Sequence, residues 1–173
     1  MAKHYLCIID IFNWNKMKYD NSKVRRQDRL LEKENAIHLL QHGEYGILSM
    51  SDGTSGYGIP LNYVWDGEDS IYIHCAMEGH KLNIIAKYPD VSFCVVGNTK
   101  VLPDKFSTLY ESIVVTGKAV LGLPEDERMK ALEWILDKYS PEDKEVGMKY
   151  AAASFKRTEI IRIQIITFSG KNK

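Results

Sequence analysis

The stretch Ile71–Leu82 (IYIHCAMEGHKL) holds the residues of this chain whose types and spacing best suit chemistry. A strand pattern gives way there to a helix pattern at Glu78-Gly79-His80-Lys81. A helix N-terminus presents free backbone N–H groups, a glycine permits close approach, and a lysine adds a point charge. These features predict a cradle for a phosphate group. An ordinary polar turn with a solvated lysine fits the same residues, so the spacing leaves both interpretations open.

His74 lies in the strand part of this stretch. Side chains alternate along a strand, so Ile71, Ile73 and Cys75 face one side. Tyr72 and His74 then face the other side. A histidine at the lip of a pocket could hold a ligand or carry a proton near neutral pH. A half-buried histidine bonded to a backbone carbonyl is the alternative.

The histidines and cysteines nearby do not form a metal-binding or nucleophile motif. His74 and Cys75 face opposite sides of a strand and cannot easily share one ion, and neither C-x-x-C nor H-E-x-x-H spacing occurs. Cys75 and Cys94 fall in apolar strand runs, where a small buried thiol is ordinary. We therefore expect no metal site and no cysteine or serine nucleophile.

Composition limits the class of protein. The chain has 173 residues, of which 45% are hydrophobic, and this length predicts one domain with a real core. Its 23 basic and 23 acidic residues argue against a general binder of nucleic acids or anionic membranes. Three cysteines indicate a reducing compartment. No apolar run approaches the roughly 20 residues of a membrane span. Residues 1–12 lack a signal cleavage site, so we expect a cytoplasmic protein.

Hydrophobic periodicity and turn residues predict an alternation of helices and strands. Helices are expected over residues 26–42, 79–88, 124–139 and 141–155, and strands over 45–50, 57–65, 70–76, 91–96, 110–121 and 159–168. Six antiparallel strands with helices at the edges predict a mainly β fold, a closed or nearly closed barrel. The absence of a G-x-G-x-x-G loop and of regular βαβ alternation excludes a Rossmann domain. We expect an N-terminal extension over 1–24 and a single domain over 25–173.

Five segments resemble the flavin-binding split-barrel superfamily, the group of pyridoxamine-phosphate-oxidase-like proteins. They are GEYGILSM (43–50), YGIPLNYVW (57–65), IYIHCAMEGHKLNII (71–85), PDVSFCVVG (89–97) and YESIVVTGKA (110–119). Within that superfamily the chain is most similar to the nitroimidazole-resistance (Nim) branch, over about residues 25–170. The resemblance implies a six-stranded antiparallel Greek-key split barrel with flanking helices, and a homodimer with flavin at the interface.

The resemblance also implies where a flavin, FMN in preference to FAD, would bind. The phosphate would lie at Gly79-His80-Lys81, the ring along residues 60–64, and His74 beside the ring. Glu111 and Ser112 would approach from the other subunit. The residues assigned to the cofactor are Pro60, Leu61, Asn62, Tyr63, Val64, His74, Cys75, Gly79, His80, Lys81, Glu111 and Ser112.

The function implied is a flavin-dependent oxidoreductase. It would pass electrons from a reduced nicotinamide to a small acceptor such as a nitroimidazole, with His74 orienting or protonating the acceptor. A non-catalytic flavin- or haem-binding carrier or sensor is the alternative. Vitamin B6 chemistry is not expected, because the C-terminal segment from Glu159 contains Arg162 but no adjacent histidine for a substrate phosphate.

Overall fold

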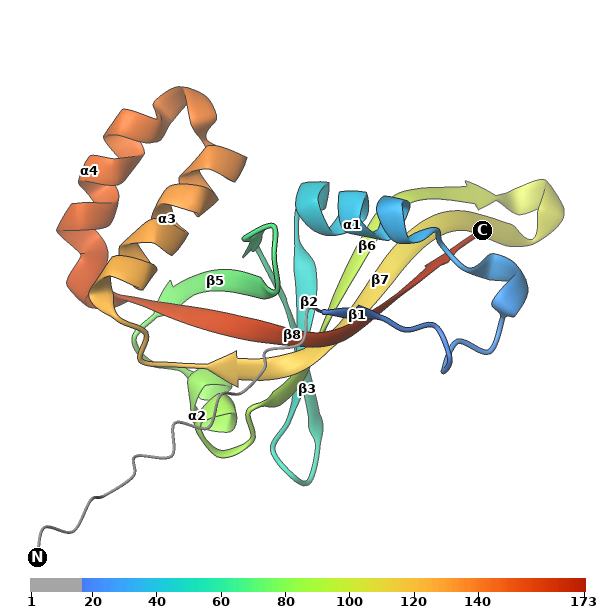
Figure 1. Ribbon diagram of the computed structural model, residues 1–173, viewed down its shortest axis with the longest axis horizontal. Helices are drawn as coiled ribbons and strands as arrows, with labels where there is room; N and C mark the ends of the chain where they lie inside the picture. The colour runs from blue at the N-terminus through green and yellow to red at the C-terminus, as the bar shows by residue number, and fades with distance from the viewer. Residues whose placement is uncertain (1–16) are drawn as a thin grey trace, which may run out of the picture.

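The computed structural model describes residues 17–173, whose backbone forms a single sheet flanked by helices (Figure 1). The strands are β1 (Lys18–Tyr19), β2 (Gly46–Ser51), β3 (Gly56–Leu61), β4 (Val64–Trp65), β5 (Ser70–Ala76), β6 (Asp90–Leu102), β7 (Ser107–Val120) and β8 (Thr158–Asn172). Hydrogen bonds connect them in the order β3-β2-β6-β7-β8-β5-β4, and every pair on this path is antiparallel. The short β1 pairs in parallel with β8 beside this path.

Four α-helices of the described residues flank the sheet. They are α1 (Lys33–His42), α2 (His80–Lys87), α3 (Glu125–Tyr139) and α4 (Lys144–Ser154). In Figure 1 α1 lies above the sheet, α2 lies below it, and α3 and α4 form a hairpin at one end. Residues Glu125, Asp126 and Glu127 occupy the first turn of α3, where the helix dipole favours negative charge.

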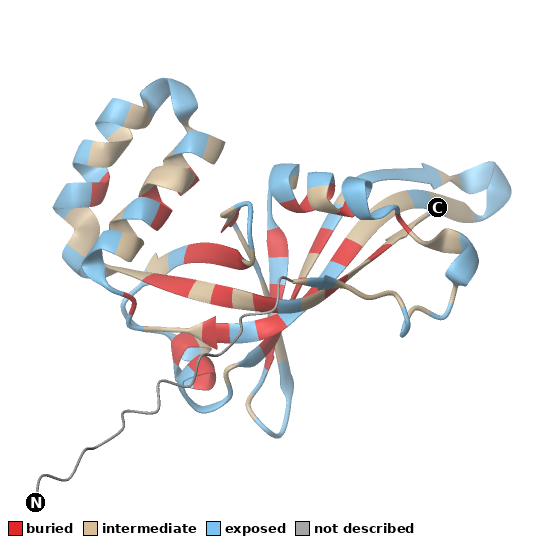
Figure 2. Cartoon of the chain, viewed as in Figure 1, coloured by how far each residue is buried: buried red, intermediate tan, exposed pale blue. Residues whose placement is uncertain are grey.

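The alternating side chains of β7 show how the sequence builds the main core. Ile113, Val115 and Ala119 are buried, whereas Val114 and Lys118 between them are exposed. One face of the strand therefore packs into the barrel, and the other face lies outside. The same period of two produces the buried positions of β6 and β8 that Figure 2 shows in red.

A second, smaller core lies under the α3–α4 hairpin. Tyr72 of β5 and Ile160 of β8 pack there against apolar residues of α3, among them Leu132. The Tyr72 hydroxyl lies 3.1 Å from a carboxylate oxygen of Glu127. Both faces of β5 are thus covered along Ile71–Ile73, and exposure begins only at His74.

The predicted mainly β split barrel with flanking helices is confirmed, but the predicted number of strands is wrong. The run 57–65 was expected to be one strand, and it breaks at Asn62 and Tyr63 into β3 and β4. These two strands pair with different partners, β2 and β5, and lie at opposite ends of the sheet order, so the barrel stays open. With β1 added, the described residues contain eight strands instead of six.

Helix starts also differ from the prediction. The helix expected over 26–42 begins at Lys33, after a 3-10 turn at Gln27–Arg29. The helix expected over 141–155 begins at Lys144, after a 3-10 turn at Pro141–Asp143. In each case the spacing of apolar residues predicts which face of the helix is buried, but it does not predict the residue at which the helix begins.

Part of the predicted N-terminal extension packs on the sheet. The Tyr19 ring lies 4.8 Å from that of Phe168, and its hydroxyl donates to the carbonyl of Leu31. Residues 1–16 of the expected extension lie outside the described residues. Among residues 17–173, no helix combines the length and the apolar character that a membrane crossing requires.

Candidate functional site

The strand β3 and the start of α2 meet at the open side of the barrel. His80, the first residue of α2, places its ring edge-on against Tyr57 of β3. The ring centroids are 4.9 Å apart and the ring planes are inclined by 72°. Edge-to-face aromatic pairs at this separation attract one another. The contact therefore holds the N-terminus of α2 next to β3, although β5, from which α2 follows, lies near the other end of the sheet order.

The N-terminus of α2 is uncapped by any side chain. Gly79 precedes it with a φ of 143°, a conformation that favours glycine, and a Cβ added there would have no atom within 4 Å. The first N–H groups of a helix have no intrahelical partner, and Gly79 supplies no side-chain acceptor for them. Lys81 lies in the same turn. Free N–H groups, open space and a cation are the features that hold a phosphate.

Cys75, near the end of β5, is half-buried and close to this turn. Burial raises the pKa of its thiol, and the positive charge of Lys81 acts in the opposite direction. The burial effect is the larger of the two, so the thiol is protonated at neutral pH and is a poor nucleophile.

The segment Pro60–Val64 contains exposed and buried residues. Pro60 and Asn62 are exposed, and with Leu61, Glu44 and Tyr45 they line an open hollow of about 420 Å³. Tyr63, in contrast, is fully buried in the main core. Backbone atoms of Pro60–Asn62, next to this hollow, are therefore the ones in this segment that a ring outside the barrel could reach.

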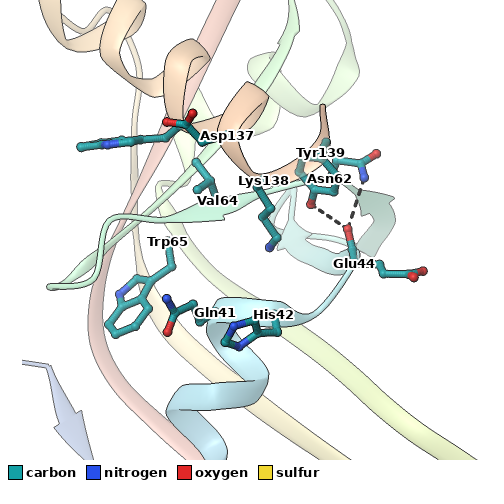
Figure 3. A pocket seen from close by; sticks show the side chains of 10 residues that line it. Gln41, His42, Glu44, Asn62, Val64, Trp65, Asp137, Lys138 and Tyr139 are labelled. Carbon is teal, nitrogen blue, oxygen red and sulfur yellow. Dashed lines mark hydrogen bonds between the residues drawn. The ribbon is translucent and has the colours of Figure 1, made fainter. Parts of the chain in front are cut away.

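A tyrosine of α3 fixes the backbone at the break between β3 and β4. The backbone N–H of Tyr63 donates to the Tyr139 hydroxyl at 3.0 Å, and that hydroxyl lies 2.7 Å from the carbonyl oxygen of Glu44. The side-chain amide of Asn62 donates to the same carbonyl at 3.2 Å (Figure 3). Because Tyr139 already engages the backbone of Tyr63, α3 and the end of β3 form one hydrogen-bonded unit.

His74 faces the α3–α4 hairpin. It lines a largely apolar cavity of about 390 Å³ together with Leu132, Leu136, Val146 and Tyr150. Partial desolvation there lowers the pKa of His74 below its ordinary value, so the ring is neutral at pH 7. An uncharged imidazole can still donate or accept one hydrogen bond within the cavity.

Glu111 and Ser112 lie elsewhere in the same chain. Glu111 accepts a hydrogen bond from the Asn98 side chain and lines a separate cavity of about 370 Å³ beside the end of α1. Ser112 pairs with Val96 of β6 on the exposed side of the sheet. Glu44 and Tyr45 line both this cavity and the hollow at Pro60, so the two recesses share a wall.

Within one chain the predicted cofactor residues therefore form three groups. The first is the α2 turn with Cys75, the second is Pro60–Asn62, and the third is Glu111 and Ser112, whereas Tyr63 and Val64 are buried. His74 faces the α3–α4 hairpin, on the opposite side of β5 from Cys75. The described residues contain no cluster of three or more His, Cys, Asp or Glu arranged to hold a metal ion.

Sequence reasoning did not find Tyr57 or Tyr139. Tyr57 occupies an alternating strand position, a pattern that could have placed it on the same face as Ile59. Tyr139 reaches Tyr63 across 76 residues of sequence, and no local pattern signals such a contact.

The open eight-stranded sheet with its helix hairpin is a split-barrel fold, and the comparisons with known proteins define the family. The family model of pyridoxamine 5'-phosphate oxidase matches residues 32–172, and the chain belongs to this family. This match confirms the superfamily expected from the sequence. No curated protein shows significant similarity in sequence.

Solved structures of other proteins share this fold. A proposed 5-nitroimidazole antibiotic resistance protein from Bacteroides thetaiotaomicron superposes with a TM-score of 0.69 and 18% identity, over 83% of this chain and 86% of that one. A FAD-binding protein from Mesorhizobium loti gives 0.63 and 21%, over 84% and 97% of the two chains. A flavocytochrome from Azotobacter vinelandii gives 0.70 and 17%, over 82% and 67%.

Proposed function

We propose that this protein is a homodimeric, cytoplasmic, flavin-dependent oxidoreductase. It passes electrons from a reduced nicotinamide to a small nitro-aromatic acceptor. The observation that carries the proposal is the uncapped start of α2, with Lys81 in its first turn, held by the His80–Tyr57 contact beside β3. Membership of the pyridoxamine 5'-phosphate oxidase family and the likeness to a FAD-binding protein support flavin as the cofactor.

The residues present fit a flavin. The open space at Gly79 and the free N–H groups of α2 suit its phosphate, and Lys81 supplies the positive charge. The hollow at Pro60–Asn62 gives the planar ring a surface beside which backbone groups could form hydrogen bonds with the ring edge. FMN and FAD share the inner phosphate, so the turn would hold that phosphate of either cofactor. A bound flavin supplies redox chemistry that side chains lack, while the protein supplies position and electrostatics.

His74 is the residue proposed to act on the acceptor. Its ring lies at an apolar cavity whose volume, about 390 Å³, is within the range of small-ligand sites. Because burial lowers its pKa, His74 is neutral at pH 7 and would orient a nitro group through one N–H donor. As the pH falls, a growing fraction of the rings carries the extra proton that a general acid delivers.

The outer face of the sheet supports a dimer. Ile47 of β2, Val96 of β6 and Val114 of β7 are exposed there. Ile47 pairs with Cys94, and Cys94 pairs with Val114, so these side chains form a continuous apolar strip. Contiguous exposed apolar surface of this kind marks interaction sites. Ser112, opposite Val96 in the register, borders the strip and would reach the flavin of the partner subunit together with Glu111.

Oxidation of pyridoxamine phosphate is not part of the proposal. Arg162 is the single arginine after Glu159, and its guanidinium lies 2.7 Å from the carboxylate of Glu127. Both side chains are largely shielded from solvent. An arginine engaged in this way is not available to bind a substrate phosphate.

The test is an anaerobic spectrum of the purified full chain. We expect a yellow protein whose flavin bands bleach when NADH or NADPH is added and return when a nitroimidazole follows. A protein that stays yellow with every donor would support the alternative of a non-catalytic carrier. An intense haem band would support a haem module, a possibility raised by the likeness to a flavocytochrome. A chain that binds no flavin would overturn both the oxidoreductase and the flavin carrier.

A further inference from the structure

A cavity of about 740 Å³ lies between the C-terminal ends of α1 and α3 and the strand β4 (Figure 3). Its lining consists of Gln41, His42, Glu44, Asn62, Val64, Trp65, Trp134, Asp137, Lys138 and Tyr139. It is separate from the His74 cavity, because the two use different residues of α3. Its volume is ample for a molecule with one aromatic ring.

Lys138 places a cation in this cavity with nothing to accept its protons. Its ammonium nitrogen is buried and has no hydrogen-bond partner among the described residues. It lies 3.7 Å from the centroid of the Tyr63 ring and 5.3 Å from that of Tyr139. Aromatic faces attract a cation, but they replace little of the hydration that its three N–H donors lose. A negatively charged acceptor would stabilise such a buried ammonium, because it would accept hydrogen bonds from the N–H groups and balance the charge.

The acidic residues of the lining do not neutralise Lys138. Asp137 lies 2.7 Å from the ammonium of Lys144, and in Figure 3 its carboxylate points away from Lys138. The Glu44 carboxylate also points outward, and its backbone carbonyl is the group that meets Asn62 and Tyr139. The charge directed into the cavity is therefore positive.

The remaining lining suits a planar molecule. The indole N–H of Trp65 is buried and, within the described part of the chain, also lacks an acceptor. Val64 and Trp134 add apolar and aromatic wall, and Gln41 adds a neutral amide. The ring of His42 also lines the cavity, where its Nδ1 lies 2.9 Å from the carbonyl oxygen of His38. The cation favours a negatively charged group, the further N–H donor favours an acceptor atom, and the aromatic walls favour a planar ring.

We propose that this cavity binds an aromatic carboxylate, with the carboxylate on the Lys138 ammonium and the ring along Trp65. The proposed carboxylate contact with Lys138 uses neither the α2 turn nor His74, although the cavity shares Glu44 and Asn62 with the hollow at Pro60–Asn62. Burial lowers the pKa of Lys138 to about 8, so its amine is charged at pH 7 and loses its charge above that value. Binding should accordingly weaken as the pH rises from 7 to 9, a range in which benzoate itself stays ionised.

The test measures benzoate binding to the purified full chain by calorimetry, with quenching of tryptophan fluorescence as a second readout. Benzamide is the matched neutral ligand, and Lys149→Met is the control variant, since Lys149 is an exposed lysine on α4. We expect benzoate to bind at least tenfold more tightly than benzamide. Lys138→Met should remove that preference, whereas Lys149→Met should keep it. Lys138→Arg, which retains the charge, serves as a second variant if Lys138→Met fails to fold.

Three outcomes would overturn the inference. The first is no benzoate binding, or equal binding by the wild type and a folded Lys138→Met. The second is inorganic phosphate binding as tightly as benzoate, which would make the cavity a simple anion site. The third is loss of flavin from folded Lys138→Met, which would make the cavity part of the flavin site. If the chain binds benzoate with this preference but no flavin, the inference stands and the proposed function fails.

Discussion

The ring of His80 stands edge-on to the ring of Tyr57, with centroids 4.9 Å apart, and this contact joins the start of α2 to β3. The imidazole is therefore engaged in packing. In the proposed site, the backbone N–H groups and Lys81, and not the His80 ring, would therefore bind the phosphate. This division of roles between neighbouring residues leads to the first prediction.

Lys81→Ala should weaken flavin binding by about 1.5–3 kcal/mol, the range for a hydrogen bond to a charged group. That loss corresponds to a dissociation constant raised by roughly ten- to a hundredfold or more. The measurement is fluorescence titration of the apoprotein with FMN. Lys87→Ala, at the other end of α2, is the control and should bind FMN as the wild type does. Equal affinity of the Lys81 and Lys87 variants would remove Lys81 from the site.

Gly79→Ala should destabilise the fold by about 1–3 kcal/mol, because an L-residue pays that cost for such a backbone conformation. The added methyl group itself has room. Gly56→Ala is a matched control, since a Cβ there also has open space and the backbone needs no positive φ. Urea denaturation of both apoproteins provides the comparison. A Gly79 variant as stable as the Gly56 variant would show that the turn adapts without strain.

His74→Gln should leave the protein folded and yellow, because the ring lies at the open end of β5. Turnover of a nitro-aromatic acceptor should fall by about 10²-fold, the usual contribution of a positioned acid or base. Specific activity per bound flavin and the melting temperature are measured on the same sample. A variant that melts several degrees lower but keeps full specific activity would assign His74 a structural role only.

The stability of the folded protein should depend on pH through the protonation of His74. Burial lowers its pKa in the folded chain below the ordinary value of 6.5, so the unfolded chain binds the proton more readily. The stability contributed by the neutral ring is present above pH 6.5 and is lost as the pH falls through the folded pKa. Between pH 7 and 5 the denaturation midpoint of the wild type should therefore fall further than that of His74→Gln, which has no group to titrate at this position. Parallel pH dependences would show that burial of His74 does not affect stability.

Val114→Asp should disrupt the proposed dimer. Val114 lies in the middle of the exposed strip on β7, where a buried, unpaired carboxylate would be costly. Light scattering should give a monomer mass, and flavin should be lost together with the interface. Val146→Asp, at an exposed position on α4, is the control and should remain dimeric. A wild-type monomer that retains its flavin would refute the dimeric site.

The sequence predicted the parts of the fold that depend on local pattern. The β5 strand at Ser70–Ala76 and the start of α2 at His80 follow from alternation and from Gly79. The break at Asn62 and Tyr63 was missed, because the run 57–65 is strand-like throughout and the break is held by Tyr139 of a distant helix. Alternation placed Tyr72 on the face opposite Ile71 and Ile73, but it could not show that α3 covers that face.

The candidate site was predictable only where all of its residues come from one segment of the sequence. The α2 turn is such a segment, and the structure shows it uncapped and open. Lys138 could not be identified, because its ordinary position in a helix becomes unusual only when β4 and α1 enclose it. The proposed contact of Glu111 with the flavin of a partner subunit cannot be read from the fold of one chain.

A crystal structure of the full chain with its flavin tests the central claim most directly. The account predicts the flavin phosphate within hydrogen-bond distance of the Lys81 ammonium and the first backbone N–H groups of α2. It also predicts the ring beside Pro60–Asn62 and the Tyr57–His80 contact intact. A phosphate bound elsewhere, with the start of α2 facing solvent, would contradict it.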